Sequence, residues 1–191
     1  MFLYLASSSP RRQELLRQLG IDFQVVVPDI DEAVQAGEAA REYVQRLAQA
    51  KAAAVHRGLA SALPAPVLGA DTAVVLAGEI LGKPRDRTDG IAMLQRLAGR
   101  THEVLTGLCL IHEHGVESAL AVTQVRFGAL TEPECARYWD SGEPADKAGG
   151  YGIQGRAAAF VAEIRGSYSG VVGLPLFELA QLLKAIGWQL K

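Results

Sequence analysis

Residues 67–81 read VLGADTAVVLAGEIL, an apolar run that a single carboxylate, Asp71, interrupts. The run predicts a buried strand, and Gly78-Glu79 predicts a tight turn into a short second strand. An ionised carboxylate inside such a strand is costly unless it meets a metal ion, a cation or a catalytic task. The alternative is a bulge at which Asp71 binds neighbouring backbone N–H groups. We expect a functional role, because Lys83 follows one hairpin later.

On both sides of this hairpin, short β-rich runs alternate with amphipathic helical windows, without repeats, linkers or low-complexity tracts. The further predicted strands cover residues 2–6, 22–28, 102–112, 116–128, 157–164 and 169–173. The predicted helices cover residues 10–19, 38–57, 87–98, 131–141 and 175–186. This alternation predicts an α/β fold with a mixed sheet, in a single domain over residues 1–191.

The composition is that of an ordinary globular protein, with 49% hydrophobic residues and 19 Lys and Arg against 21 Asp and Glu. A net charge of -2 argues against a nucleic-acid partner bound through a basic face. The first residues lack a basic leader, no apolar run approaches the roughly 20 residues of a membrane span, and the two cysteines lie in apolar or helical stretches. We therefore expect a cytoplasmic protein with neither a nucleic acid nor a membrane as partner.

Three serines and a proline precede Arg11 and Arg12, at the start of a predicted helix. Each arginine there is unfavourable by roughly 0.3–1 kcal/mol, because the helix dipole is already positive at this end. A bound anion reverses that cost, since N–H groups, hydroxyls and guanidinium groups then point donors at one spot. The alternative reading makes Ser9 an N-cap and leaves the arginines in solvent.

Only five of the 19 cations are lysines, at positions 51, 83, 147, 184 and 191. Lys51 lies on the helix face that carries Tyr43, Val44 and Leu47, so it emerges from the apolar stripe. A lysine in that place either extends along the surface into solvent or faces a pocket. His112 and His114 resemble metal ligands, but their place at a predicted hairpin tip favours solvated histidines.

Two glycine-rich stretches resemble nucleotide-binding motifs only in letters. Residues 78–84 lack the spacing of a P-loop and have Pro84 where that motif has a hydroxyl. Residues 150–155, GYGIQG, lack the strand before and the helix after that a dinucleotide site needs. The backbone of this second loop can still approach a ligand closely, with Asp146, Lys147, Tyr151 and Gln154 as its polar side chains.

Together these residues suit a site that binds a phosphate chain and activates water with one acid. No residue offers itself as a covalent nucleophile, so direct attack by water with a divalent ion on the phosphates is the economical mechanism. Glu32, in an acidic turn after the strand at 22–28, is placed to share that ion with Asp71.

Six motifs, in order along nearly the whole chain, resemble those of the Maf family of nucleoside triphosphate pyrophosphatases. They are LASSSPRRQELL at 5–16, AKA at 50–52, GADT at 69–72, GKPRD at 82–86, GEPADKAGGYGIQG at 142–155 and VVGLPL at 171–176. The resemblance implies an elongated α/β fold with a bent mixed sheet, similar to the inosine triphosphate pyrophosphatases, and a cleft between two lobes. It also implies hydrolysis of a nucleoside triphosphate to the monophosphate and pyrophosphate with Mg²⁺ or Mn²⁺.

Carried over to this sequence, the resemblance makes Asp71 the general base, while the metal ion shared by Glu32 and Asp71 remains the expectation drawn from the acidic turn. The phosphate-binding residues would be Ser7, Ser9, Arg12, Lys51 and Lys83, although the triple serine leaves open which two hydroxyls matter. Three positions separate the substrate classes of the family, and here they hold Arg11, Thr72 and Gln154, as in the subgroup that acts on dTTP and UTP.

The resemblance further implies a house-cleaning role on modified pyrimidine nucleotides, a link to arrest of cell division, and a homodimer as one assembly. Two alternatives stay open: a nucleotide-sensing regulator of septum formation with secondary hydrolysis, and a pyrophosphatase for 7-methyl-GTP or purine nucleotides.

Overall fold

A mixed β-sheet forms the centre of the computed structural model, which describes residues 2–59 and 65–189. Within these ranges the sheet has seven strands in the order β2-β1-β3-β5-β6-β7, with β4 paired to β3. The strands are β1 (Phe2–Leu5), β2 (Asp22–Val25), β3 (Val67–Leu76), β4 (Glu79–Leu81), β5 (Thr101–His112), β6 (Gly115–Phe127) and β7 (Val161–Arg165). β1 is parallel to both β2 and β3, whereas the other pairs are antiparallel, so the predicted mixed sheet is confirmed.

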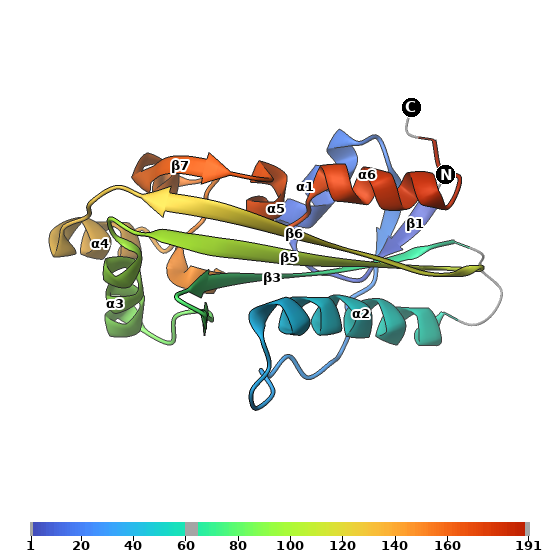
Figure 1. Ribbon diagram of the computed structural model, residues 1–191, viewed down its shortest axis with the longest axis horizontal. Helices are drawn as coiled ribbons and strands as arrows, with labels where there is room; N and C mark the ends of the chain where they lie inside the picture. Colours follow the sequence, from blue (N-terminus) through green and yellow to red (C-terminus); the bar gives the residue numbers. More distant parts are fainter. Residues whose placement is uncertain (1, 60–64, 190–191) are drawn as a thin grey trace.

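Helices cover both faces of this sheet and give the molecule an elongated shape (Figure 1). The helices are α1 (Pro10–Gln18), α2 (Ala40–Gly58), α3 (Arg87–Leu97), α4 (Glu132–Trp139), α5 (Tyr168–Val172) and α6 (Leu176–Ala185), with short 3-10 turns η1 (Ala148–Gly150) and η2 (Arg156–Phe160). α2 covers one face, α1, α5 and α6 cover the other, and α3 and α4 lie at one end of the long strands (Figure 1). No helix in the described ranges is long and apolar enough to cross a membrane.

Two glycines let α2 lie directly on the strands. A Cβ atom at Gly69 of β3 would lie 2.1 Å from the carbonyl oxygen of Ala48, and one at Gly107 of β5 would lie 2.6 Å from that of Val44. Any larger residue at either position would overlap the helix backbone. The side chains of α2 therefore start close to β3, and Lys51 is one of them.

One edge of β3 is open in its middle. β5 pairs with β3 along residues 67–75, but on the other edge β1 reaches only Val67 and Leu68, and β4 reaches only 74–76. Residues 69–73 have no partner strand on that edge within the described part of the chain. Since successive side chains of a strand point to opposite faces, a cleft at this gap reaches Asp71 on one face and Thr72 on the other.

Three sequence predictions need correction. Residues 169–173, predicted as a strand from their valines, lie mostly in α5, because the Ser167 hydroxyl accepts a hydrogen bond from the N–H of Gly170 (3.0 Å) and caps a helical turn. Residues 157–160 belong to η2, so the predicted strand at 157–164 begins only at Val161. The turn between β3 and β4 consists of residues 77–78, one position earlier than the predicted Gly78-Glu79.

Candidate active site

A cleft of about 860 Å³ lies at the open edge of β3. It brings together every site residue that the sequence predicted. These residues are Ser7, Ser9, Arg11, Arg12, Glu32, Lys51, Asp71, Thr72, Lys83, Asp146, Lys147, Tyr151 and Gln154. They come from the loop after β1, the start of α1, the loop before α2, α2 itself, β3, the segment after β4, and the glycine-rich loop after α4.

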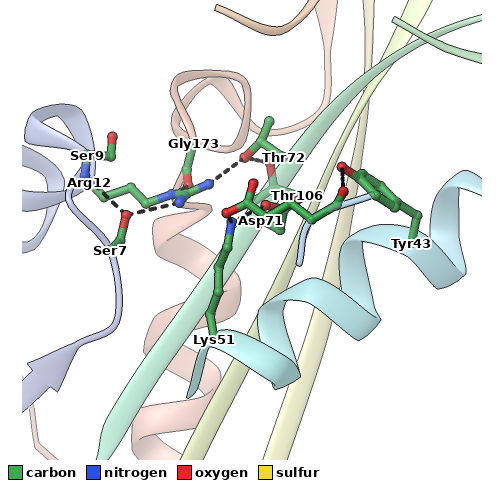
Figure 2. Close-up of polar contacts among 10 residues, drawn as sticks. Ser7, Ser9, Arg12, Tyr43, Lys51, Asp71, Thr72, Thr106 and Gly173 are labelled. Atoms are coloured by element: carbon green, nitrogen blue, oxygen red, sulfur yellow. Dashed lines mark hydrogen bonds and ion pairs between the residues drawn. The ribbon is translucent and has the colours of Figure 1, made fainter. Parts of the chain in front are cut away.

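Lys51 and Asp71 form a buried ion pair in the floor of this cleft (Figure 2). The Lys51 Nζ atom lies 2.7 Å from Asp71 Oδ1, and each side chain is only 8% exposed. Lys51 therefore does not extend into solvent, and Asp71 does not sit at a bulge, because β3 and β5 stay in register through it. Burial raises the pKa of the Asp71 carboxyl above its ordinary value, while the charges of Lys51 and Arg12 oppose that rise.

Glu32 completes this charged group from the acidic loop before α2. Its Oε1 lies 2.9 Å from Lys51 Nζ, and its side chain is 56% exposed. The loop is fastened to α2 by the Tyr43 hydroxyl, which donates to the Glu32 carbonyl oxygen (3.1 Å), and by Arg46, which donates to the Ala33 carbonyl oxygen (3.0 Å). Burial raises the pKa of Tyr43 to about 12, so its hydroxyl remains a donor at neutral pH.

The start of α1 forms the opposite wall. The Ser7 hydroxyl oxygen accepts from the N–H of Ser9 (3.2 Å) and from Arg12 Nη1 (3.1 Å). Ser9 occupies the N-cap position but makes no side-chain capping bond to the described residues, so its hydroxyl is available to a ligand. The N-cap position of Ser9 confirms that part of the alternative reading, but Arg12 is not left in solvent as that reading expected.

Arg12 is held in place rather than solvated. Its Nε atom donates to the carbonyl oxygen of Gly173 (2.8 Å), and its Nη2 atom donates to the Thr72 hydroxyl (3.2 Å; Figure 2). Thr72 in turn lies 3.0 Å from the hydroxyl of Thr106, which donates to the carbonyl oxygen of Gly170 (2.8 Å). Thr106 had no place in the sequence prediction, although a hydroxyl within the apolar run 104–111 was a usable signal.

The three candidate lysines differ in their surroundings. Lys51 is paired, as described, and the Lys147 Nζ atom donates to the Glu143 carbonyl oxygen (2.7 Å) and to Asp146 Oδ1 (2.6 Å). Lys83 lines the cleft, is exposed, and forms no hydrogen bond or ion pair with the described residues. Of these three lysines, Lys83 is thus the one that can turn most readily to a ligand.

The glycine-rich loop contributes Gln154, whose side chain is exposed and makes no hydrogen bond to the described part of the chain. Nearby, Tyr151 is buried, and its hydroxyl lies 2.8 Å from Nε2 of His102, a residue that the sequence left without a role. Burial lowers the pKa of His102 to about 4, so the imidazole is neutral at neutral pH. The pair anchors the loop to β5.

The donor set suits a hard divalent cation only together with a ligand. The described residues contain no group of three or more His, Cys, Asp and Glu side chains placed to hold a metal. His112 and His114 therefore belong to no such group. The carboxylates of Glu32 and Asp71 do converge on one point, because both lie within 3 Å of Lys51 Nζ. Two carboxylates fit Mg²⁺, which typically keeps several waters and takes further oxygens from substrate phosphates.

Comparison with known proteins gives close relatives over nearly the full length. A dTTP/UTP pyrophosphatase of Hahella chejuensis is 54% identical, with 97% of this chain and 92% of that protein covered. A dTTP/UTP pyrophosphatase of Ralstonia nicotianae is 56% identical, with 95% and 92% covered. Among solved structures, a nucleoside-triphosphatase (dITP/XTP pyrophosphatase) of Mycobacterium abscessus matches with a TM-score of 0.46 and 14% identity, over 97% of this chain and 94% of that one. The family model described as Maf-like protein matches residues 2–186, and the chain therefore belongs to the family of Maf-like proteins.

Proposed function

We propose that this protein is a nucleoside triphosphate pyrophosphatase that hydrolyses dTTP and UTP to the monophosphate and pyrophosphate. The observation that carries the proposal is the buried Lys51–Asp71 pair at the base of a cleft that also holds Arg12 and Lys83. The relatives named dTTP/UTP pyrophosphatase, at 54% and 56% identity, support the same substrates.

In this mechanism the start of α1 and the side chain of Lys83 bind the triphosphate. The Ser9 hydroxyl and the first N–H groups of α1 point donors at an anion, and the helix dipole favours its charge. Arg12, fixed by Gly173 and Thr72, presents a guanidinium that needs no reorganisation when the phosphates arrive. Lys83 closes on the phosphates from the segment after β4.

Asp71 acts as the general base. A water oxygen bonds to a phosphorus of the α–β anhydride, the bridging oxygen leaves with the other phosphate, and the proton of the water passes to the Asp71 carboxylate. A base works best when its pKa lies near the working pH, and burial moves the pKa of Asp71 in that direction. Lys51 keeps the buried carboxylate ionised until it takes the proton of the attacking water.

Glu32 and Asp71 are the residues that would hold a divalent cation, Mg²⁺ or Mn²⁺. When bound, such an ion neutralises charge on the phosphates and orients them for in-line attack. Tyr43 fixes the backbone at Glu32, from which the carboxylate reaches Lys51 Nζ beside Asp71. Without a bound cation, the positive charge of Lys51 lies within 3 Å of both carboxylates and offsets their mutual repulsion.

The base of the nucleotide is read by the glycine-rich loop. The amide of Gln154 donates and accepts at once, which suits the O4 and N3–H edge of uracil or thymine. Arg11 and Thr72 are the other two residues that we assign to substrate selection. A wrong base would leave buried polar groups unpaired, and this is a strong source of discrimination.

We also propose that residues 1–191 form one domain that acts in the cytoplasm on free pyrimidine nucleotides, including those with modified bases. A continuous sheet that joins β2 to β7 supports the single domain. Two free cysteines, Cys109 and Cys135, both buried, are compatible with a reducing compartment.

Release of pyrophosphate from a panel of nucleoside triphosphates, with Mg²⁺ or Mn²⁺, tests this function. We expect the highest kcat/KM for dTTP and UTP. Tight binding of all triphosphates without turnover would favour a nucleotide sensor. A higher kcat/KM for 7-methyl-GTP or purine triphosphates would favour the other substrate class.

A further inference from the structure

The side chain of Gln154 does not help to hold the glycine-rich loop in place. Ile153 is buried, whereas the side chain of Gln154 is exposed at the cleft. Gln154 makes no hydrogen bond to the described residues. Its position in the cleft therefore depends on the contacts of the residues on either side of it.

One carboxylate, that of Glu143, binds both ends of this segment. Its Oε2 atom accepts from the backbone N–H of Arg156 (2.9 Å), two residues after Gln154. Its Oε1 atom accepts from the hydroxyl of Tyr138 (2.7 Å), and the same hydroxyl oxygen accepts from the N–H of Gly152 (3.0 Å), two residues before Gln154. The two ends of residues 152–156 are thus joined through a single side chain.

The direction of these hydrogen bonds is fixed by their chemistry. A backbone N–H can only donate, so the Tyr138 oxygen accepts from Gly152, and its own proton is left for Glu143. Tyr138 is buried at 3% exposure, and burial raises the pKa of its hydroxyl, which stays protonated at neutral pH. Both oxygens of Glu143 are therefore acceptors here.

The backbone of the loop is also shaped around this carboxylate. A Cβ atom at Gly155 would lie 2.3 Å from the Glu143 carboxyl carbon, and one at Gly152 would lie 2.7 Å from Cε of Lys147. Lys147 in turn donates to the Glu143 carbonyl oxygen (2.7 Å). The glycines of this stretch therefore serve close approach to Glu143 and Lys147 instead of binding a dinucleotide.

We propose that Glu143 is a positioning residue for substrate selection, which holds residues 152–156 so that Gln154 meets the edge of a pyrimidine. The proposal rests on the proposed function, because it assumes that Gln154 reads the base. A fixed loop limits the depth available to the base, and a purine is deeper than a pyrimidine by one fused ring. When the carboxylate is lost, the loop gains freedom, the pyrimidine loses its partner, and the purine is excluded less strictly.

The test compares kcat/KM for UTP and GTP in Glu143→Gln, Tyr138→Phe and Gln154→Ala. Gln at position 143 keeps one acceptor but replaces the other with a donor, so we expect the UTP-to-GTP ratio to fall about tenfold, mainly through a higher KM for UTP. Tyr138→Phe removes the link to Gly152 and should lower the ratio similarly. The double variant Glu143→Gln/Tyr138→Phe should lower the ratio little more than either of its single variants, since the two residues act through one connection.

A backbone variant isolates the other half of the connection. Compared with Arg156→Ala, Arg156→Pro removes only the N–H that Glu143 accepts, at the first position of η2, where proline is tolerated. This variant should lower the ratio while every side chain of the connection remains.

Glu163→Gln is the matched control, because Glu163 on β7 pairs with Arg126 and Arg165 at the exposed sheet edge. It should keep the wild-type ratio. If the wild-type protein itself prefers GTP, or if Gln154→Ala leaves the ratio unchanged, the proposed reading of the base fails. If Gln154→Ala abolishes the preference while folded Glu143→Gln, Tyr138→Phe and Arg156→Pro keep it, the role of Glu143 is refuted and the proposed function stands.

Discussion

Thr72 of β3 and Thr106 of β5 face each other in register, and their hydroxyl oxygens lie 3.0 Å apart. Thr106 uses its only proton to donate to the carbonyl oxygen of Gly170 (2.8 Å), so the proton between the two threonines must come from Thr72. The Thr72 oxygen then accepts from Arg12 Nη2 (3.2 Å). A chain of donors therefore runs in one direction, from the guanidinium in the cleft to the backbone of α5.

Thr106→Val should break this chain without changing the size of the side chain much. Thr72 then loses its acceptor, and the carbonyl oxygen of Gly170, a buried residue, loses its donor. A buried polar group left unpaired costs about 1–3 kcal/mol of stability. We expect the KM for the triphosphate to rise about tenfold, because Thr72 no longer holds Arg12 in one orientation. Thr106→Ser, which keeps the hydroxyl, should stay near wild type in urea unfolding and in kinetics. Equal losses in the Val and Ser variants would show that packing, not the hydroxyl, matters there.

Asp71→Asn keeps the shape of the proposed base but removes its ability to accept the proton of the water. Loss of a general base typically lowers kcat by about 10²–10⁴-fold. Pyrophosphate release should fall by that factor while nucleotide affinity, measured by calorimetry, changes much less. Asp140→Asn, at an exposed pair with Arg87 outside the cleft, is the control and should remain active. Wild-type kcat in the Asp71 variant would exclude the assigned role.

Gly69→Ala tests how closely α2 must lie on β3. Its Cβ would lie 2.1 Å from the Ala48 carbonyl oxygen and 2.8 Å from the Ala52 nitrogen, both backbone atoms, so the helix must move by roughly 1 Å. That movement separates Lys51 from Asp71, and a displacement of this size can cost about 10² in kcat. Gly58→Ala, at the end of the same helix with nothing within 4 Å, should leave kcat unchanged. Full activity in Gly69→Ala would mean that the ion pair tolerates a shifted helix.

His102 predicts how stability depends on pH. Burial lowers its pKa to about 4 in the folded protein, against an ordinary value of 6.5. Between these values the unfolded chain binds more protons, so the free energy of unfolding falls as pH drops from 6.5 to 4, by up to about 3 kcal/mol from this residue. His102→Gln cannot titrate and should show a flatter dependence in urea unfolding measured across that window. His56→Gln, at an exposed position of α2, should keep the wild-type slope, and an unchanged slope in His102→Gln would contradict the prediction.

Local patterns were enough to predict most of the fold and the gathering of the candidate site. The apolar run around Asp71 predicted β3, and the serines, proline and arginines before residue 13 predicted the start of α1. Both follow from periodicity and end signals, which depend on a few neighbouring residues. Residues 171–172 were misassigned for the same reason, since two valines outweighed the cap that Ser167 provides.

The residues that support the site could not be found in this way. Thr106 meets Gly170, His102 meets Tyr151, and Tyr138 meets Gly152, so each partner lies 14 to 64 positions away along the chain. No local pattern identifies such a partner, because the contact exists only after the sheet and its helices have assembled. A buried polar residue in an apolar run signals that some partner is needed, but not which one.

The open edge of β3 also affects which anions the cleft binds. Residues 69–73 have no partner strand on this edge between β1 and β4 in the described part of the chain. Arg12 reaches this gap from α1 and donates to the Thr72 hydroxyl (3.2 Å), while the chain after β4, which carries Lys83, runs back toward residue 72 because β4 is antiparallel to β3. An anion with several charged oxygens can contact both cations and gains affinity because its second contact is intramolecular. The missing segment of strand thus gives two cations from distant parts of the chain access to one polyanion.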